Sequence, residues 1–512
     1  MAINRRQFIT AGATLLSLPL PALSKALASD SADSYYHQFH QSLDQRPWLS
    51  AYESVKQNSY DSQAKIIGKW PADLRGTLYR NGPAKHEIGS FRYHHPFDGD
   101  GMIQAFRITD TGVSHQAKMI ATHKHVRETA AGRALYPTFG TEPPNPAAAT
   151  SADAINPGNI SVLHHHGKLL ALWEAGSAWE MDAESLETKG TYSFSDNMKG
   201  APFSAHPRVE PDGTLWNFGY VSYAGFLVLW HIDAAGKLVK AGKVNVDPIT
   251  MPHDFVVTAK HIVFLLPPFD FDNQSGSNFL DRHRWQPDQA TRVLVVSKED
   301  FSVQKWLDLP AQWVFHFSNA WEDRSGKIRF ESVRYQSPDI MTKNFKDIMR
   351  GNWVDASINA GQLYQYEIDT KKWTVAETPL WPLHMVTEFP TIDPRVSCQR
   401  HKRIVMLSAD TSKPRTAPHF AFNEVSVANI ESGEKQFYQY PDSQIPEEHL
   451  FVSKPGSAPD TDGWLLGTTH NWVEQTTLLN VFDFNSVDAG PIAQAVLPYV
   501  LPLGLHGKFV EG

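Results

Sequence analysis

Residues 225–239 read GFLVLWHIDAAGKLV, a stretch in which one strand ends, the chain turns and a second strand begins. Its first half is rich in β-branched and aromatic residues, which favour strands, and its AAGK segment is typical of a hairpin turn. Runs of similar length and composition recur between Gly, Asp, Asn and Pro turns: GTLYRNGP (76–83), GKLLALWEAG (167–176), HIVFLLPPF (261–269), TRVLVVSKED (291–300), KIRFESVRY (327–335), GQLYQYEID (361–369), KRIVMLSAD (402–410), GWLLGTTHN (463–471) and TLLNVFDFN (477–485). Long amphipathic helices are few. The sequence therefore predicts an all-β protein.

The number of these strands favours a radial architecture. A sandwich of roughly 450 residues would need very long sheets, whereas a β-propeller absorbs the length by repeating four-stranded blades. Six to eight blades fit, although neither WD nor kelch repeats occur. The Pro- and Ala-rich stretch 140–159 is interpreted as a loop, because strand patterning resumes directly after it. We expect one domain over residues 29–512.

Charge and cysteine content exclude other classes. Lys and Arg number 47 against 55 Asp and Glu, a net charge of −8, so the chain lacks the basic surface typical of nucleic-acid binding. The single cysteine, Cys398, allows no disulfide within the chain. We expect no nucleic-acid partner and a fold that does not depend on oxidation.

The first 28 residues are predicted to be an export signal. Arg5 and Arg6 precede a modest apolar stretch and a small-residue A-x-A site at residues 26–28, a pattern typical of the twin-arginine type. The alternative is an N-terminal anchor, but the stretch is short and broken by proline. The pattern predicts an exported, periplasmic protein. Twin-arginine export often carries proteins that are loaded with a cofactor before export.

Four of the 23 histidines share a setting at the edge of an apolar strand, beside an aromatic residue, Pro or Gly. They are His206 in SAHPRVEPDG, His253 in MPHDFVVT, His316 in FHFSNAWED and His506 in GLHGKF. Their spacing matches no zinc finger and no H-E-x-x-H helix. It suits a radial fold in which each inner strand sends one side chain to a common axis. The alternative is that each is a hydrogen-bonded structural histidine.

Two other groups of histidines are considered as metal sites. The triplet 164–166 lies in LHHHGK and is interpreted as a solvated hairpin turn rather than a metal site. His94 and His95 precede DGDG, which is similar to a calcium loop but lacks the remaining acidic positions of an EF-hand.

In their order along the chain, eight motifs resemble those of the carotenoid cleavage oxygenases. They are GTLYRNGPA (76–84), HPFDGDGM (95–102), LLALWEAG (169–176), AHPRVEPDG (205–213), MPHDFVVT (251–258), FHFSNAWED (315–323), TEFPTID (387–393) and LGLHGKF (503–509). The resemblance covers the chain from about residue 70 onward. It implies a seven-bladed propeller, capped by loops and short helices, with one non-haem Fe(II) on the axis.

The resemblance also implies a set of site residues. His206, His253, His316 and His506 would bind the iron, and four neutral imidazoles leave a ferrous ion its full charge and open coordination positions. Three carboxylates would orient the imidazoles: Glu174 for His253, Glu388 for His316 and Glu448 for His506. Glu447 is an adjacent alternative to Glu448, and Glu322 is interpreted as structural.

The reaction implied is cleavage of a C=C bond of an apolar, conjugated substrate by O₂, giving two carbonyl products. The protein would hold the double bond beside the iron and exclude water. We expect Trp173 and Phe315 to line the substrate tunnel, with core packing as the alternative. Members of the family draw lipid-soluble substrates from membranes through an apolar patch, so peripheral membrane contact is also expected.

The substrate class rests on the resemblance alone. We favour a carotenoid or an apocarotenoid. A stilbenoid is the alternative, because stilbene-cleaving members recognise a phenol with a Tyr and a Lys, and Lys118, Lys124 and Tyr136 lie in a suitable region. A retinoid-ester isomerase and a non-catalytic, ligand-binding propeller are the other candidates.

Overall fold

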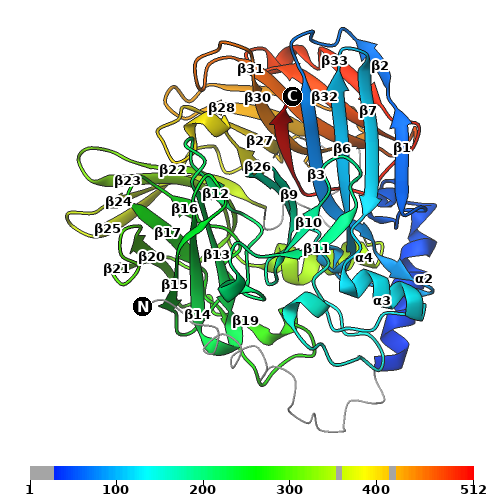
Figure 1. The fold of residues 1–512 in the computed structure, drawn as a ribbon, viewed down its shortest axis with the longest axis horizontal. Coiled ribbons are helices and arrows are strands. Elements are labelled where there is room, and N and C mark those ends of the chain that lie inside the picture. The colour runs from blue at the N-terminus through cyan, green and yellow to red at the C-terminus, as the bar shows by residue number, and fades with distance from the viewer. Residues whose placement is uncertain (1–27, 353–359, 414–421) are drawn as a thin grey trace.

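Seven antiparallel sheets of four or five strands surround one axis in the computed structural model, which describes residues 28–352, 360–413 and 422–512 (Figure 1). The all-β, seven-bladed propeller predicted above is therefore confirmed. Blade 1 contains β1 (Ser59–Gln63), β3 (Gly76–Lys85), β6 (Asp100–Thr109), β7 (Gly112–Met119) and β34 (His506–Glu511). Blade 2 contains β8 (Ser161–His165), β9 (Lys168–Leu172), β10 (Ala178–Met181) and β11 (Thr188–Tyr192). Blade 3 contains β12 (Arg208–Val209), β13 (Leu215–Val221), β14 (Phe226–Ile232) and β15 (Leu238–Asn245).

The remaining blades follow in chain order. Blade 4 contains β16 (Val256–Val257), β17 (His261–Leu266), β20 (Thr291–Ser297) and β21 (Gln304–Leu309). Blade 5 contains β22 (Trp313–Glu322), β23 (Lys327–Tyr335), β24 (Gln362–Asp369) and β25 (Thr374–Pro379). Blade 6 contains β26 (Met385–Thr391), β27 (Arg403–Asp410), β28 (Glu424–Asn429) and β29 (Lys435–Gln439). Blade 7 contains β2 (Lys65–Gly68), β30 (Gln444–Ser453), β31 (Gly463–Asn471), β32 (Thr476–Asp483) and β33 (Ala493–Val496).

Short elements lie outside the blades. The two-stranded hairpins are β4 (Glu87–Ile88) with β5 (Phe91–Arg92), and β18 (Phe269–Phe271) with β19 (His283–Trp285). The α-helices of the described residues are α2 (Ala28–Leu43), α3 (His123–Ala131) and α4 (Phe345–Met349), the last preceded by a π-helical turn at Ile340–Asn344. Figure 1 shows the three α-helices together at one side of the propeller. Single 3₁₀ turns occupy Pro47–Tyr52, Pro96–Asp98, Ala152–Ala154, Asp196–Met198, Ser222–Ala224, Leu280–Arg282, Pro394–Val396 and Val487–Ala489.

Strand β14, the first half of the 225–239 stretch, shows why central strands read as continuous apolar runs. Successive side chains of a strand point to opposite faces, and both faces of a blade are covered by neighbouring blades. Phe226, Val228 and Trp230 pack toward blade 2 with Leu170 and Leu172. The alternate residues of β14 pack toward blade 4 in a second apolar cluster. The core therefore lies between the blades.

The two ends of the chain close the ring. The C-terminal strand β34 pairs with the N-terminal strand β3 in blade 1, with His506 opposite Asn81 (Figure 1). Strand β2, also from the N-terminal part of the chain, pairs with β33 at the edge of blade 7 opposite to β30. Because blade 1 takes strands from both ends, the ring closes through hydrogen bonds and His506 is brought to the axis.

Candidate metal centre

Four histidines from the inner edges of four blades meet at the axis. His206 lies two residues before β12, His253 three residues before β16, His316 within β22, and His506 at the start of β34. The Nε2 atom of His253 lies 3.0 Å from that of His206 and 3.3 Å from that of His316. The centres of neighbouring rings in this set are 4.5–5.1 Å apart. One nitrogen from each of His206, His316 and His506 lies within 4.8 Å of the others.

Three carboxylates contact the outer nitrogens of three of these rings. His253 Nδ1 lies 2.5 Å from Glu174, His316 Nδ1 lies 2.5 Å from Glu388, and His506 Nδ1 lies 2.8 Å from Glu448. A carboxylate only accepts, so each Nδ1 carries the proton and donates it. The Nε2 atom of each neutral ring then presents a lone pair to the centre. His206 makes no hydrogen bond to a carboxylate within the described residues.

These donors fit a divalent transition metal. The Nε2 atoms of His253 and His316 face each other at 3.3 Å, and in the neutral rings, whose proton is on Nδ1, neither Nε2 has a proton to donate to the other. Two nitrogens that bind one ion at right angles, each about 2.1 Å from it, are about 3.0 Å apart. Imidazole suits iron, zinc, copper and nickel. The cluster therefore has the donor type and spacing of an imidazole-bound metal.

Burial and mutual contact determine the charge states of the cluster. Burial, and then the neighbouring imidazoles, hold the pKa of His206 well below its usual value. Burial also lowers the pKa of His506, although Glu448 opposes this. Burial works against ionisation of Glu388, but the neighbouring His316 outweighs it and the pKa of this carboxyl is lowered. The pKa of Glu448 is lowered in the same way by His506.

Shifts of register in the β-ladders occur beside several of these side chains and set the direction in which they point. The pairing of β22 with β23 shifts register between Val314 and Phe317, the segment that contains His316. The pairing of β26 with β27 shifts directly after Glu388. The pairing of β30 with β31 shifts between Pro446 and His449, around the two adjacent glutamates. Bulges redirect side chains next to functional sites, and here they direct them to the axis.

The bulge in β30 distinguishes Glu447 from Glu448. Glu448 contacts His506, whereas Glu447 pairs with the buried Arg80 at 3.2 Å and accepts a hydrogen bond from the Gly504 amide at 2.6 Å. Arg80 also donates to the backbone oxygen of Glu448 at 3.3 Å. Glu448 therefore contacts the axial His506, while Glu447 is held by Arg80 and the Gly504 amide. Glu322, the other acidic alternative, bonds His261 at 3.0 Å instead.

Two residues beside the cluster were missed at the level of sequence. Phe389 stacks on His316 with 5.4 Å between ring centres, and its φ of 54° is a left-handed conformation that is costly for a bulky residue. Tyr335 donates its hydroxyl to Glu388 at 2.9 Å. The sequence feature that could have identified Phe389 is its position directly after Glu388. Tyr335 lies 53 residues from Glu388, and no local pattern points to it.

The two aromatic residues predicted to line a tunnel differ in position. Phe315 is buried, and its ring centre lies 5.3 Å from that of His253 and 5.6 Å from that of Tyr335. Trp173 is half-buried and packs on the apolar cluster between blades 2 and 3. Phe315 therefore lies against the histidines, and Trp173 lies in an interblade core.

Among the described residues, the other histidines do not join the cluster. The triplet 164–166 is not a solvated turn throughout: His165 lies on β8, is 5% exposed and contacts the Gly213 carbonyl oxygen at 2.9 Å. The expectation of a solvated turn was wrong for this residue, because strand β8 extends to His165 although the histidines are polar. His95 is fully buried, and its Nε2 lies 3.2 Å from the Met341 carbonyl oxygen.

The two lysines considered for phenol recognition have different surroundings. Lys118 pairs with Glu187 on the surface. Lys124 is fully buried and contacts Tyr93 at 2.7 Å, Asp100 at 2.8 Å and Glu128 at 2.9 Å. Its three N–H donors are thus matched by three oxygens. Asp100, from the DGDG motif, is therefore held by Lys124.

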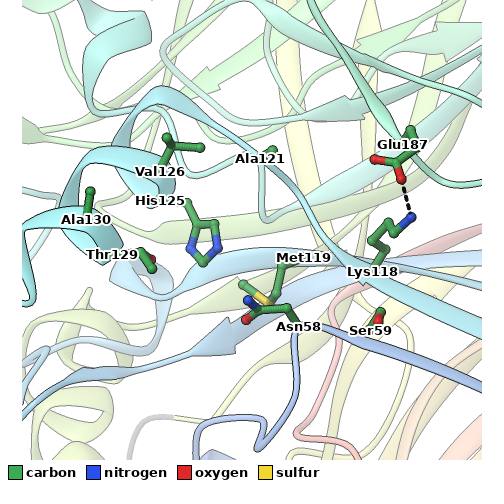
Figure 2. A pocket seen from close by; sticks show the side chains of 10 residues that line it. All are labelled: Asn58, Ser59, Lys118, Met119, Ala121, His125, Val126, Thr129, Ala130 and Glu187. Carbon is green, nitrogen blue, oxygen red and sulfur yellow. Dashed lines mark hydrogen bonds and ion pairs between the residues drawn. The ribbon is translucent and has the colours of Figure 1, made fainter.

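An open cavity of about 440 Å³ lies outside the propeller axis, between α3, β1 and β7 (Figure 2). Figure 2 shows His125 of α3 on the side facing Met119, and the pair of Lys118 with Glu187 at the rim. None of the four axial histidines lines this cavity. It is therefore separate from the metal centre.

Within the described ranges, no helix has the length and apolar character needed to cross a bilayer. The predicted signal over residues 1–28 falls outside the described residues except for its last position, where α2 begins. Arg5 and Arg6 are among the residues outside.

Comparison with known proteins relates this geometry to a family. The family described as retinal pigment epithelial membrane protein matches residues 52–511. Apocarotenoid-15,15'-oxygenase of Synechocystis sp. is 30% identical, with 91% of this chain and 96% of that protein covered. Isoeugenol monooxygenase of Pseudomonas nitroreducens is 25% identical, covering 87% and 94%, and lignostilbene-alpha,beta-dioxygenase isozyme III of Sphingomonas paucimobilis is 26% identical, covering 87% and 93%.

A solved structure extends the likeness to the fold. Cobalt-substituted Synechocystis ACO matches with a TM-score of 0.82 at 28% identity, covering 91% of this chain and 98% of that chain. The family match over residues 52–511 includes all four axial histidines. The chain therefore belongs to the retinal pigment epithelial membrane protein family, the carotenoid cleavage oxygenases, enzymes that cleave carbon–carbon double bonds.

Proposed function

We propose that this protein is an Fe(II)-dependent dioxygenase that cleaves a C=C bond of a carotenoid or an apocarotenoid with O₂, giving two carbonyl products. The observation that carries the proposal is the axial cluster: four imidazoles meet, and three of them are oriented by buried carboxylates. His206, His253, His316 and His506 would hold one iron per chain. When bound, the iron supplies the redox chemistry that O₂ needs to react with a closed-shell alkene.

The protein's own residues orient the imidazoles and shield the substrate from water. Glu174, Glu388 and Glu448 keep three imidazoles in the tautomer that presents Nε2 to the axis. Their negative charge also offsets the charge of a divalent ion in a buried site. Phe315 and Phe389, both beside the histidines, present apolar surface to a conjugated substrate and exclude water from it. The reaction adds both atoms of O₂ to the two alkene carbons, so no side chain is required as a nucleophile or a base.

The preference for a carotenoid-type substrate has two supports. The Synechocystis relative is named for an apocarotenoid substrate and matches over 91% of this chain. Lys124, the buried lysine in the region considered for phenol recognition, has all its donors matched by Tyr93, Asp100 and Glu128. A phenol would have to displace one of these partners, two of which are carboxylates.

A phenolic stilbenoid is the second candidate, and one observation favours it. Tyr93 and Lys124 contact each other at 2.7 Å, and a Tyr and a Lys are the residue types with which stilbene-cleaving members of the family recognise a phenol. Two relatives are named for isoeugenol and lignostilbene. The substrate class therefore has to be decided by experiment.

The test is a substrate panel with purified, iron-loaded protein: β-carotene, an apocarotenal, resveratrol and a retinyl ester, with product masses and ¹⁸O₂ incorporation measured. We expect labelled aldehydes from a carotenoid or the apocarotenal. Turnover of resveratrol alone would favour the stilbenoid candidate, and a cis isomer of retinol without label, separated by chromatography, would indicate an isomerase. Failure of the purified protein to retain stoichiometric iron after loading, with no turnover of any substrate, would indicate a non-catalytic, ligand-binding propeller.

The location of the protein is part of the same proposal. The twin-arginine pattern supports export to the periplasm after the iron has been loaded. Contact with a membrane surface would give the enzyme access to a lipid-soluble substrate.

A further inference from the structure

The backbone that carries three of the four histidines has few ladder hydrogen bonds. Strands β12 and β16, which follow His206 and His253, are two residues long each. His316 lies in the register shift of β22. By contrast, His506 lies in a regular ladder, opposite Asn81 of β3. Something other than the sheets must fix the three segments of blades 3, 4 and 5 relative to one another.

Asp254, directly after His253, contacts two of these segments. It is 3% exposed. Its Oδ1 accepts the Phe255 amide at 2.7 Å, and its Oδ2 accepts the Phe317 amide at 2.9 Å. Phe317 directly follows His316. One carboxylate therefore connects the His253 segment to the His316 segment.

Arg208, two residues after His206, adds the third segment. Its Nη2 donates to Asp254 Oδ2 at 2.6 Å and to the Phe317 carbonyl at 3.2 Å. Its Nε donates to the Phe255 carbonyl at 2.9 Å, and its Nη1 donates to the Ser318 carbonyl at 3.3 Å. The planar guanidinium thus contacts the chain beside His253 and beside His316 at once.

We propose that Arg208 and Asp254 are positioning residues that hold His206, His253 and His316 at the spacing a metal ion requires. A guanidinium presents donors in a rigid fork, and charge-assisted hydrogen bonds are stronger than neutral ones. The pair acts on the backbone rather than on the imidazoles. It supplies for His206, which has no carboxylate partner within the described residues, a constraint that the other three obtain from glutamates.

The inference rests on the proposed metal site, and its test measures metal binding rather than turnover. Co²⁺ affinity is determined by chelator competition, and the visible spectrum of the Co²⁺-loaded protein reports ligand geometry. Arg208→Gln removes the fork and the charge, Asp254→Asn keeps the shape without the charge, and Arg208→Lys keeps the charge without the fork. Arg334→Gln is the matched control, because Arg334 pairs with Glu377 at 2.8 Å in blade 5 and is 21% exposed against 19% for Arg208.

We expect Arg208→Gln and Asp254→Asn to weaken Co²⁺ binding on the order of 10- to 100-fold, the range typical of residues that support metal ligands. Both should shift the Co²⁺ bands, Arg208→Lys should be intermediate, and Arg334→Gln should bind as the wild type does. Wild-type affinity and spectrum in Arg208→Gln would overturn the inference. Failure of the wild-type protein itself to bind Co²⁺ would instead contradict the proposed function.

Hydrogen exchange on the wild-type protein provides a test that needs no folded variant. If Arg208 and Asp254 support the metal site, loading with Co²⁺ should raise the protection of the Phe255 and Phe317 amides, whose N–H groups donate to Asp254. The amide of Tyr366, in β24 of blade 5, should not change. Equal changes at all three amides, or no change at Phe255 and Phe317, would overturn the inference.

Discussion

Glu388 Oε2 lies 2.5 Å from His316 Nδ1, while Oε1 of the same carboxylate accepts the Tyr335 hydroxyl at 2.9 Å. Oε2 also accepts the amide of Phe389 at 2.5 Å. Both oxygens are therefore held in place, and the pKa of Glu388 is lowered because its contact with His316 outweighs burial. The carboxylate is ionised, and it fixes His316 with its Nε2 lone pair toward the axis.

Glu388→Gln should weaken iron binding without unfolding the protein. The amide oxygen can still accept the His316 proton, but the negative charge that strengthens the imidazole as a ligand is lost. We expect a 10- to 100-fold loss of iron affinity, with partial turnover restored by excess iron, since this is the typical effect of such changes. Iron content and O₂ consumption with substrate measure both effects. Glu367→Gln, which removes a carboxylate from the surface pairs with Lys327 and Arg329, is the control, and equal affinities in the two variants would contradict the role of Glu388.

His253→Ala should abolish both iron binding and activity. Its Nε2 lies within 3.3 Å of two other imidazole nitrogens, so its loss removes the ligand nearest to the rest of the cluster. His164→Ala, on β8 of blade 2 and outside the cluster, should change neither quantity. Both variants are measured in parallel for iron and for O₂ consumption. If His164→Ala loses iron while His253→Ala keeps it, the choice of histidines is wrong.

The fold was predictable because the propeller repeats one local pattern. Each central strand, such as β14, is buried on both faces and reads as an apolar run bounded by turn residues. The site residues carried a weaker signal, since each lies alone in its motif. Four histidines and three glutamates selected from motifs do lie together at the axis, but their role as iron ligands and supports stays a prediction.

Other features of the site depend on tertiary contacts that no local pattern encodes. In a regular strand, Glu447 and Glu448 would point to opposite faces. The bulge in β30 lets both face inward, one to Arg80 and one to His506. Tyr335, on β23 of blade 5, contacts Glu388, on β26 of the neighbouring blade 6, at a separation of 53 residues. Bulge positions and cross-strand partners follow from pairing register, which the sequence of one strand does not determine.

Lys124→Met should destabilise the fold severely. Lys124 is fully buried, and its removal leaves the carboxylates of Asp100 and Glu128 without their cation. Removing one partner of a buried ion pair typically costs about 3–5 kcal/mol. Urea denaturation measures the loss, and Lys118→Met, which breaks an exposed pair with Glu187, should cost no more than about 1 kcal/mol. A Lys124→Met protein with wild-type stability that has lost only stilbenoid cleavage would instead assign Lys124 to phenol recognition.

Replacing Arg5 and Arg6 together by Lys should keep the protein inside the cytoplasm. The twin-arginine route is expected to read this pair, and lysines preserve the charge, so the change tests recognition rather than electrostatics. Cell fractionation and the N-terminal sequence of the exported form, with cleavage expected near Ala28, are the measurements. Export of the double variant at the wild-type level would show that another route carries the protein.

The metal-free protein should lose stability between pH 7.5 and 5.5 because it buries neutral histidines away from the metal centre. Burial lowers the pKa of His86, His95, His115 and His449 from 6.5 to about 3. Between these values the unfolded chain binds protons that the folded protein does not, so the free energy of unfolding falls as the pH falls through 6.5. Each such histidine should contribute about 1.4 kcal/mol to the loss over this range.

His115→Gln isolates one of these contributions. The His115 ring contacts Tyr499 at 2.8 Å and Gln104 at 3.3 Å, and glutamine offers polar atoms to both without titrating. Urea midpoints at the two pH values should therefore show a smaller acid loss in the variant than in the wild type, by about 1.4 kcal/mol. All other titrating groups are the same in the two proteins, so the difference belongs to the histidine. Equal losses in the two proteins would mean that His115 does not stay neutral in the folded state.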